Sequence, residues 1–453
     1  MLHFASMYLF IVLLMIISLK GLHYDLVSVD ATAPVSNSTV IIHDPSLRAE
    51  LVTDGLSFPT TMDFLGPNDI LVLEKNNGTV QRIVNGTMLS NPILDVNVAN
   101  KSNRGLLGIA VAQRENRSTY VFLYYTETKI EGSDICPKSW YCLPGHDPLG
   151  NRLYRYELVN NKLVNPTLLL DLPAVPGITH VGGKVLIGPD NNIYLTVGDL
   201  DYRSNTQNFP NKTASNGTSA IYRITQDGKP VNAILDKGNP LNKYYAYGLR
   251  NSFGIDFDPV TGKLWDTENG PAFGDEINLV EPGFNSGWRK VQGIWETEGT
   301  YYGDEVLLNY TGFKEKVKAN PSGLENFGGN GKYSAPEFIW FNITVPTAIK
   351  FLNTEKLGKQ YQNDIVIGDY SKGNIYHFKL NQNRTGLLLN GTLADKIANN
   401  PEELEGIKFG EGFGYITDIQ VSPYDGYLYI LSTGTNGKIF RIVSTTLNSN
   451  EFQ

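Results

Sequence analysis

Cysteine, histidine and charge are scarce in this chain, and each shortage narrows the range of functions. The 453 residues include only 2 cysteines and 6 histidines, so neither a dense disulfide framework nor a zinc site of thiolates and imidazoles is expected. Charged residues make up 19% and the formal net charge is −8, which leaves no basic surface for nucleic acid. A small neutral or cationic ligand, or a metal ion, suits this balance better.

Several motifs of nucleotide-binding and hydrolytic proteins are also missing. The sequence has no EF-hand spacing, no P-loop and no dinucleotide-binding glycine fingerprint between a strand and a helix. It also lacks the Gly-x-Ser-x-Gly elbow of serine hydrolases. Long helical periods are few, whereas 45 glycines and 25 tyrosines accompany recurrent Asn-Gly, Asp-Gly and Pro-Gly turns. The composition therefore favours one large all-β unit.

An apolar run at residues 7–19 is shorter than a typical membrane span and suits the core of a secretory signal. No Lys or Arg precedes it, and the best cleavage candidate, Ala31-Thr32-Ala33, lies well downstream, so an uncleaved anchor stays open. We predict a signal peptide or N-terminal membrane anchor at 1–33 and an extracellular or cell-surface location. Contact with a membrane is expected only through this segment.

Glycosylation and a local disulfide would agree with export. Cys136 and Cys142 flank a short loop, and in an oxidising compartment a disulfide closing that loop is expected. The sequence also contains eleven Asn-x-Ser/Thr sequons. They begin at Asn37, Asn77, Asn85, Asn100, Asn116, Asn211, Asn216, Asn309, Asn342, Asn383 and Asn390.

One pattern recurs along the chain: an apolar or aromatic strand, a Gly or Asn turn, and a second strand. Each pair predicts adjacent antiparallel strands. The six pairs are DILVLEK (69–75) with TVQRIV (79–84), TYVFLYYTE (119–127) with RLYRYEL (152–158), NIYLTVGD (192–199) with AIYRIT (220–225), KLWDTENG (263–270) with EINLVEP (276–282), DIVIGDY (364–370) with NIYHFKL (374–380), and YLYILSTG (427–434) with KIFRIV (438–443).

Six pairs spread over the whole chain predict an all-β, six-bladed β-propeller with long loop insertions, because each blade is a small sheet that packs on its neighbours. A large β-sandwich built of similar hairpins is the alternative. We expect a linker at 34–48, the propeller at 49–446 and a C-terminal tail at 447–453.

Loops at one end of such a propeller converge around its central channel, and three candidate positions lie in loops of this kind. His180 has small neighbours and is a candidate general base, which the carboxylate of Asp199 would orient. Arg250 and Asn251 offer donors to a carboxylate or a quinone oxygen. Two alternatives stay open from the residues alone. His180 could be an ordinary packing or hydrogen-bonding residue, and Arg250 could form a salt bridge with Asp266 or Glu268 within the propeller.

A third feature is the turn at 269–276. Backbone carbonyls at Asn269-Gly270-Pro271, followed by the carboxylates of Asp275 and Glu276, supply the oxygen-only ligands that calcium prefers.

The motifs, taken in order, resemble the glucose/sorbosone dehydrogenase family over roughly residues 51–443. The matching segments are GLLGIAV (105–111), HVGGKVLIGPDNNIYLTVGD (180–199), GLRN (248–251), ENGPAFGDEINL (268–279) and NSGW (285–288). The resemblance implies a six-bladed propeller, and a soluble quinoprotein that oxidises aldose sugars with pyrroloquinoline quinone and calcium.

The resemblance also implies roles for individual residues. His180 would be the base that takes the proton of the anomeric hydroxyl while hydride passes to the quinone, with Asp199 beside it. Arg250 would lie near the reacting quinone carbonyl and Asn251 would contact the cofactor. Calcium ligands are implied too: backbone carbonyls of Gly270 and Pro271 for the ion that bridges to the cofactor, and Glu276 with the backbone of Ser286 for a structural ion.

The chain departs from the family where the cofactor's carboxylates are held. Glucose-oxidising members use a late lysine and two closely spaced arginines, whereas this chain has Lys372 one position out of register and no arginine in 414–418. An early glutamine is also missing at 103–105, where Arg104 is the substitute candidate. We therefore expect Lys372 and Arg104 to contact the cofactor.

Two functions follow from this sequence. The first is an exported quinoprotein-type dehydrogenase that acts on an aldose sugar or related alcohol and passes electrons to an external acceptor. The alternative is a calcium-stabilised propeller that binds a glycan or a protein without turnover, and the missing arginines favour it.

Overall fold

The structure is a computed structural model that describes residues 39–113, 118–129, 148–201, 206–208, 216–297 and 318–445. The described residues all belong to one compact unit. The predicted signal or anchor at 1–33, the tail at 447–453 and both cysteines lie outside the described residues. Within those residues, no helix is both long and apolar enough to cross a membrane.

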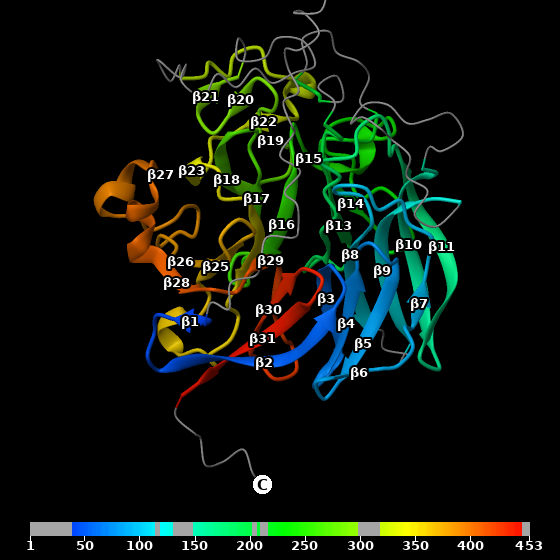
Figure 1. The fold of residues 1–453 in the computed structure, drawn as a ribbon. Coiled ribbons are helices and arrows are strands. Elements are labelled where there is room, and N and C mark those ends of the chain that lie inside the picture. Colours follow the sequence, from blue (N-terminus) through cyan, green and yellow to red (C-terminus); the bar gives the residue numbers. More distant parts are fainter. Residues whose placement is uncertain are drawn as a thin grey trace, which may run out of the picture. The chain divides into compact units, whose positions relative to one another are not determined.

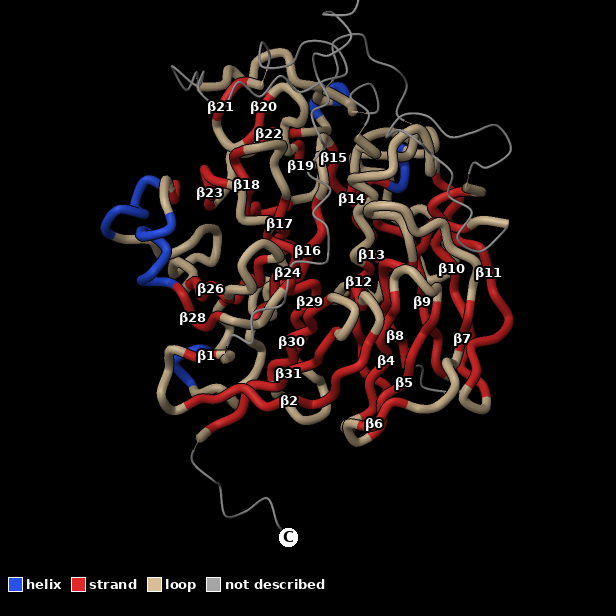
Figure 2. The backbone as a smooth tube through the Cα atoms, viewed as in Figure 1, coloured by secondary structure: helices blue, strands red, loops and turns tan. Residues whose placement is uncertain are grey.

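Strands are the main regular secondary structure of the described part, and many loops connect them (Figure 2). The helices in it are short 3-10 turns, and their bounds are η2 (Leu241–Lys243), η3 (Phe327–Gly329), η4 (Lys359–Tyr361), η5 (Gly391–Asp395) and η6 (Pro401–Ile407). The fold is an all-β propeller, as predicted from the recurring strand pairs.

The strands form six sheets of four or more strands and one two-stranded sheet, β20 (Val291–Gln292) with β21 (Trp295–Glu296). The first three large sheets contain, in order, β3 (Pro59–Gly66), β4 (Asp69–Glu74), β5 (Thr79–Val84) and β6 (Thr87–Met88), with β7 (Leu94–Asp95) also on β5; β8 (Leu106–Gln113), β9 (Thr119–Glu127), β10 (Gly150–Val159) and β11 (Lys162–Leu172); and β12 (Val185–Ile187), β13 (Ile193–Val197), β14 (Ala220–Ile224), β15 (Tyr244–Tyr247), β19 (Phe284–Asn285) and β22 (Lys332–Tyr333).

The other three large sheets follow in the second half of the chain. They contain β16 (Ser252–Phe257), β17 (Leu264–Glu268), β18 (Phe273–Val280), β23 (Phe338–Asn342) and β27 (Ile397–Ala398); β24 (Pro346–Phe351), β25 (Ile365–Asp369), β26 (Ile375–Phe378), β28 (Lys408–Glu411) and β1 (Ile41–Ile42); and β29 (Tyr415–Val421), β30 (Leu428–Thr433), β31 (Gly437–Ser444) and β2 (Leu47–Leu56).

All six predicted strand pairs are confirmed, each in a different large sheet. They are the antiparallel pairs β4/β5, β9/β10, β13/β14, β17/β18, β25/β26 and β30/β31. The first strand of each pair lies in the middle of its sheet, and strands such as β13 and β25 are buried along their whole length. Near-continuous apolar runs therefore mark these strands because both of their faces are covered.

The last sheet joins the two ends of the described chain. Blue β2 lies beside red β31 (Figure 1), and the two pair from Leu47 with Ser444 to Leu56 with Gly437. The short strand β1 pairs with β28, so Ile41 and Ile42 belong to a sheet although they fall within the predicted linker.

Strands of neighbouring sheets contact one another in a closed order: β3 with β8, β8 with β12, β13 of the same sheet with β16, β16 with β24, β24 with β29, and β29 with β3. An aspartate on one such strand repeatedly accepts a backbone N–H from the next sheet. Asp63 accepts from Val111 at 2.7 Å, Asp256 from Phe351 at 2.8 Å, and Asp418 from Met62 at 3.0 Å. These bonds satisfy buried donors that no strand ladder reaches, so they fix neighbouring sheets against each other.

Candidate active site

The candidate residues come together because the innermost strands of the sheets all begin at the same face of the propeller. Each innermost strand begins, and the strand after it ends, at the same face of the propeller, since the two are antiparallel neighbours. His180 precedes β12 and Asp199 follows β13; Arg250 and Asn251 precede β16, and Gly270 follows β17. Residues distant in the sequence thus become neighbours at what we call the site face.

The centre of this face is a histidine held by a buried aspartate. Nδ1 of His180 lies 2.7 Å from Oδ1 of Asp199, and the indole N–H of Trp288 donates to the other oxygen of Asp199 at 2.7 Å. The backbone N–H of His180 donates to the Asn103 side chain at 3.0 Å. His180 has a φ of 51°, in the left-handed region that residues other than glycine seldom adopt. Tertiary contacts, not local preference, hold this histidine in place.

The charge on Asp199 is stabilised despite its burial. Burial by itself raises the pKa of this carboxyl, but His180, Arg250 and the Trp288 N–H together outweigh it, so the pKa of Asp199 lies below its ordinary value. Because the carboxylate binds Nδ1, the second ring nitrogen, Nε2, is the one that can take a proton from a ligand.

Arg250 belongs to the same network through both its backbone and its side chain. Its carbonyl accepts the backbone N–H of Asp199 at 2.9 Å, and its guanidinium donates to the carbonyl of Asn269 at 2.8 Å and lies over the Trp288 ring. Only its backbone N–H contacts Glu268, at 2.6 Å. Among the residues that the structure describes, no ion pair joins the Arg250 side chain to an acid, so the alternative of a salt bridge within the propeller is not what its side chain shows.

Asn251 is held next to the histidine loop, where its side-chain oxygen accepts the backbone N–H of Gly182 at 3.3 Å. Its amide nitrogen is the group that remains to face a ligand.

The Gly270-Pro271 turn is fixed by Asp275. Oδ1 of this carboxylate accepts the N–H of Gly270 at 2.7 Å, and Oδ2 accepts the N–H groups of Thr344 at 2.6 Å and Val345 at 2.7 Å. Asp275 is therefore committed to backbone donors. The expectation that the Asp275 carboxylate is a ligand of a cation is therefore wrong, because both of its oxygens bind backbone donors. The turn's own carbonyls are the groups that remain for a cation.

Beneath this turn, three acidic side chains are buried together on β17 and β18. Asp266, Glu268 and Glu276 are each at most 1% exposed, and burial raises the pKa of Asp266 to about 7 and of Glu268 to about 8. The hydroxyl of Ser286 links the two glutamates, at 2.6 Å from Glu268 and 3.5 Å from Glu276. Isolated buried carboxylates are costly unless a cation balances them.

Oxygen atoms around the acids also lack partners. Both Asp266 oxygens and the side-chain carbonyl oxygens of Asn269, Asn278 and Gln292 are buried without a hydrogen bond. Such a set of oxygen donors fits calcium. In the described residues, no three acidic, histidine or cysteine side chains converge on one point, so a calcium ion here would need carbonyl and hydroxyl ligands as well.

Two predicted cofactor contacts are placed elsewhere by the structure. Arg104 is fully buried, and its guanidinium donates to the carbonyls of Ala174 and Gly177, so it braces the loop before His180. Lys372 lines a cavity on the outer part of the fourth and fifth large sheets, and neither His180 nor Arg250 lines that cavity. Neither side chain joins the histidine network.

Three residues at this face were not predicted to belong to the site. Trp288 ends the segment NSGW, but nothing in the sequence indicates its hydrogen bond to Asp199. Tyr370 and Tyr415 stack, with ring centroids 4.9 Å apart and an interplanar angle of 25°. Tyr370 follows β25 and Tyr415 begins β29, the two late segments in which the resemblance to the family implies cations.

The model of the family described as glucose/sorbosone dehydrogenase matches residues 56–441. The chain belongs to this family. Membership supports sugar oxidoreductase activity in general terms.

The named relatives cover most of the chain. The aldose sugar dehydrogenase YliI of Escherichia coli is 23% identical over 402 residues, covering 88% of this chain and 93% of that protein. Quinoprotein glucose dehydrogenase B of Acinetobacter calcoaceticus is 29% identical over 386 residues, covering 73% and 77%.

Solved structures agree on the fold. The PQQ-bound aldose sugar dehydrogenase of Streptomyces coelicolor superimposes with a TM-score of 0.60 at 19% identity, covering 88% of this chain and 99% of that one. The soluble aldose sugar dehydrogenase of Escherichia coli, in its apo form, gives a TM-score of 0.63 at 20% identity, covering 87% and 99%.

Proposed function

We propose that this protein is a sugar dehydrogenase that oxidises the anomeric hydroxyl of an aldose, or a related alcohol, with His180 as the general base. One observation carries the proposal: the His180, Asp199 and Trp288 side chains form a continuous hydrogen-bonded chain at the site face. It fits the family's chemistry, because a hydride can leave the anomeric carbon only as the hydroxyl loses its proton.

In this reaction His180 accepts the hydroxyl proton at Nε2. Asp199 keeps the other ring nitrogen protonated and stabilises the imidazolium that forms, while Trp288 holds the carboxylate in position. The resulting ring is charged only transiently, and it returns its proton to solvent after the product leaves.

Pyrroloquinoline quinone, when bound, would supply the hydride acceptor. Arg250 and Asn251 are the residues that would hold its reacting end, since their free N–H groups lie beside the histidine network and can bind a quinone oxygen. An external electron acceptor would then complete the cycle.

The residues of this site suit calcium better than they suit pyrroloquinoline quinone. The carbonyls of Gly270 and Pro271 would bind the ion at the cofactor, and Glu276 with Ser286 would bind the structural ion. The buried, unbalanced acids and their unpartnered oxygen neighbours support the second assignment. Calcium would stabilise the fold by neutralising them.

The opposite side of the site supports the cofactor less well. Arg104 is committed to backbone carbonyls, Lys372 lines another cavity, and the stacked pair Tyr370 and Tyr415 carries no charge. Losing two or three charge-assisted contacts at about 1.5 to 3 kcal/mol each weakens binding of a tricarboxylate. This observation favours the second candidate function, a calcium-stabilised propeller that binds a glycan or a protein without turnover.

Three further assignments complete the proposal. We take each of the six large sheets as one blade, with the propeller spanning about 49–446. We place the protein outside the cell or at the cell surface, with the 1–33 segment as its signal or anchor. The sequons then make it a candidate glycoprotein.

Reconstitution tests the function directly. The full chain would be incubated with calcium and pyrroloquinoline quinone, and reduction of an artificial acceptor followed across a panel of aldoses and alcohols. Turnover by the original protein would support the dehydrogenase. The Tyr415→Arg variant should then turn over about tenfold faster at limiting cofactor, because the arginine restores one charged contact. If neither the original protein nor the variant turns over any substrate or binds the cofactor in calorimetry, the dehydrogenase proposal is wrong and the alternative, a propeller that binds a glycan or a protein without turnover, is supported.

A further inference from the structure

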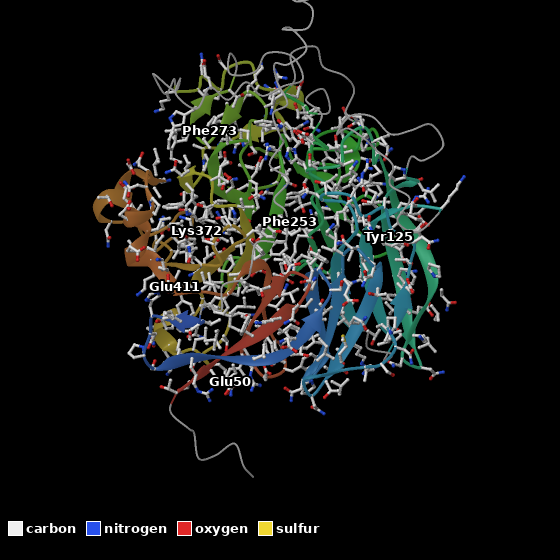
Figure 3. The ribbon with its side chains drawn as sticks, viewed as in Figure 1. Glu50, Tyr125, Phe253, Phe273, Lys372 and Glu411 are labelled. Atoms are coloured by element: carbon white, nitrogen blue, oxygen red, sulfur yellow. The ribbon has the colours of Figure 1, made fainter. Side chains whose placement is uncertain are left out.

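A cavity of about 240 Å³ lies between the fourth and fifth large sheets, away from the histidine network. It is floored by the apolar core between these sheets, where Trp340 of β23 packs against Tyr376 and Phe378 of β26, with ring centroids 6.0 and 6.3 Å apart. Lys372 and Glu411, both labelled in Figure 3, belong to its lining. Its walls therefore combine aromatic surface with charged and amide groups.

Two residues of the lining carry donors that have no acceptor among the described residues. The indole N–H of Trp340 is buried without a hydrogen bond, in a side chain that is 1% exposed. A buried unsatisfied N–H in a native fold calls for an acceptor from a ligand or an ordered water. The ammonium of Lys372 forms no ion pair with any described residue and reaches the same space from the turn after β25.

Two acceptors face the same cavity. Asn342 uses its amide nitrogen to donate to the Asn399 carbonyl at 2.9 Å, and Asn374 uses its own to donate to the Tyr376 hydroxyl at 3.1 Å. Both amide oxygens are left for hydroxyl donors. Amide oxygens beside an aromatic floor suit a ring that carries hydroxyl groups on its edges and C–H bonds on its faces.

The ion pairs of the lining indicate which charge a ligand can carry. Lys408 is neutralised by two acids, Glu405 at 2.7 Å and Glu411 at 3.3 Å. The lining thus holds two lysines and two glutamates in balance, but both glutamates are occupied by the same lysine. Lys372 is therefore the cation of the lining that has no ion-pair partner among the described residues, so its ammonium can bind a carboxylate of a ligand.

From these groups we propose that the cavity is a second binding site, for a single-ring sugar acid, separate from the site of His180. The carboxylate would bind Lys372, a ring or hydroxyl oxygen would accept from Trp340, and hydroxyl groups would donate to Asn342 and Asn374. The inference does not rest on the proposed dehydrogenase activity, because none of these residues belongs to the histidine network.

Calorimetry on the full chain tests the proposal, with protein made without glycosylation because Asn342 begins a sequon. The probe is glucuronate, compared with glucose, which lacks the charge, and acetate, which lacks the ring. Glucuronate should bind at least about tenfold more tightly than either. Lys372→Gln should remove that advantage, whereas Lys379→Gln, at an exposed lysine outside the cavity lining, should preserve it.

Two further variants separate this site from the other one. Trp340→Phe keeps the ring and removes the N–H, and it should weaken glucuronate binding about fivefold while the protein still melts cooperatively. His180→Ala should leave glucuronate binding unchanged. Equal binding of acetate and glucuronate, an unaffected Lys372→Gln variant, or loss of binding in His180→Ala would each overturn the proposal. If Trp340→Phe does not fold, the exposed Lys372 decides the outcome.

Discussion

Among the described residues, two imidazole–carboxylate pairs lie within hydrogen-bonding distance, and their surroundings differ. His180 bonds Asp199 through Nδ1 at 2.7 Å, in loops at the site face. His377 of β26 bonds Asp364, the residue just before β25, through Nε2 at 2.9 Å. Asp364 precedes the strand that ends near Tyr370, so this second pair lies at the opposite end of its sheet from the site face.

The contrast lies in what surrounds each pair. Asp199 has a second donor, Trp288, and shares its network with Arg250, whereas the ring of His377 packs edge-on against Tyr361 at 5.1 Å. A histidine beside a carboxylate is therefore not a sign of catalysis in itself. It becomes a candidate base where its free nitrogen faces a ligand site and its partner is held by further bonds.

Replacing the two histidines gives the largest expected difference. His180→Ala should lower kcat/KM by about 10²–10⁴-fold, since the proton acceptor is lost. His377→Ala should leave kcat/KM within about twofold of the original and act mainly on thermal stability. Steady-state kinetics of the reconstituted protein measure both. Equal losses in the two variants would show that His180 has no special role.

Replacing the two carboxylates should give a smaller but parallel difference. Asp199→Asn keeps the shape of the side chain and removes the charge that fixes the imidazole tautomer, so kcat should fall about 10²-fold or more. Asp364→Asn should leave kcat unchanged. Substrate saturation curves separate an effect on kcat from one on KM, and an effect of Asp199→Asn on KM alone would contradict the assigned role.

The outer partners of the two pairs come next. Trp288→Phe removes the second donor to Asp199 and should lower kcat about tenfold. Tyr361→Phe removes a hydroxyl that donates to Asp44 at 2.8 Å, and it should leave kcat as it is. A Trp288→Phe variant with full activity would show that Asp199 alone orients the histidine.

The pH dependence of stability gives the smallest effect. The pKa of Asp199 is lowered in the folded state, so the unfolded chain takes up its proton first as the pH falls. Its contribution is complete above the unfolded-state pKa of about 4 and is lost as the pH falls through the folded-state value. Denaturant unfolding at several pH values should show the destabilisation by Asp199→Asn shrinking below about pH 4. A constant difference would mean that the carboxylate is not stabilised as described.

Much of the fold was predictable because it depends on local patterns. The six strand pairs were readable from apolar strands and from turns such as Asn77-Gly78 between β4 and β5, where Gly78 has a φ of 71°, in the left-handed region that Gly tolerates. The strand β1 was missed, since two residues are too few to give a pattern. The order of loops around the site face then followed from the antiparallel pairing within each pair.

Individual side chains at the site were less predictable. His180, Asp199, Arg250 and Asn251 were expected together and lie together, because all four are tied to strand ends. Arg104 was expected at the cofactor but turns into carbonyls of a loop about 70 residues later in the chain. Nothing in the residues near position 104 indicates that loop, since it reaches Arg104 only through the folded ring.

The sequence by itself determined the all-β architecture, the strand pairs and the set of residues that reach the site face, since each depends on residues close together in the chain. Only the tertiary structure decided which of two histidines meets a supported carboxylate, which cations are already committed, and where Lys372 reaches. Those outcomes depend on contacts between sheets, and the energy of burying or pairing a charge is fixed by neighbours that the chain brings in from far away.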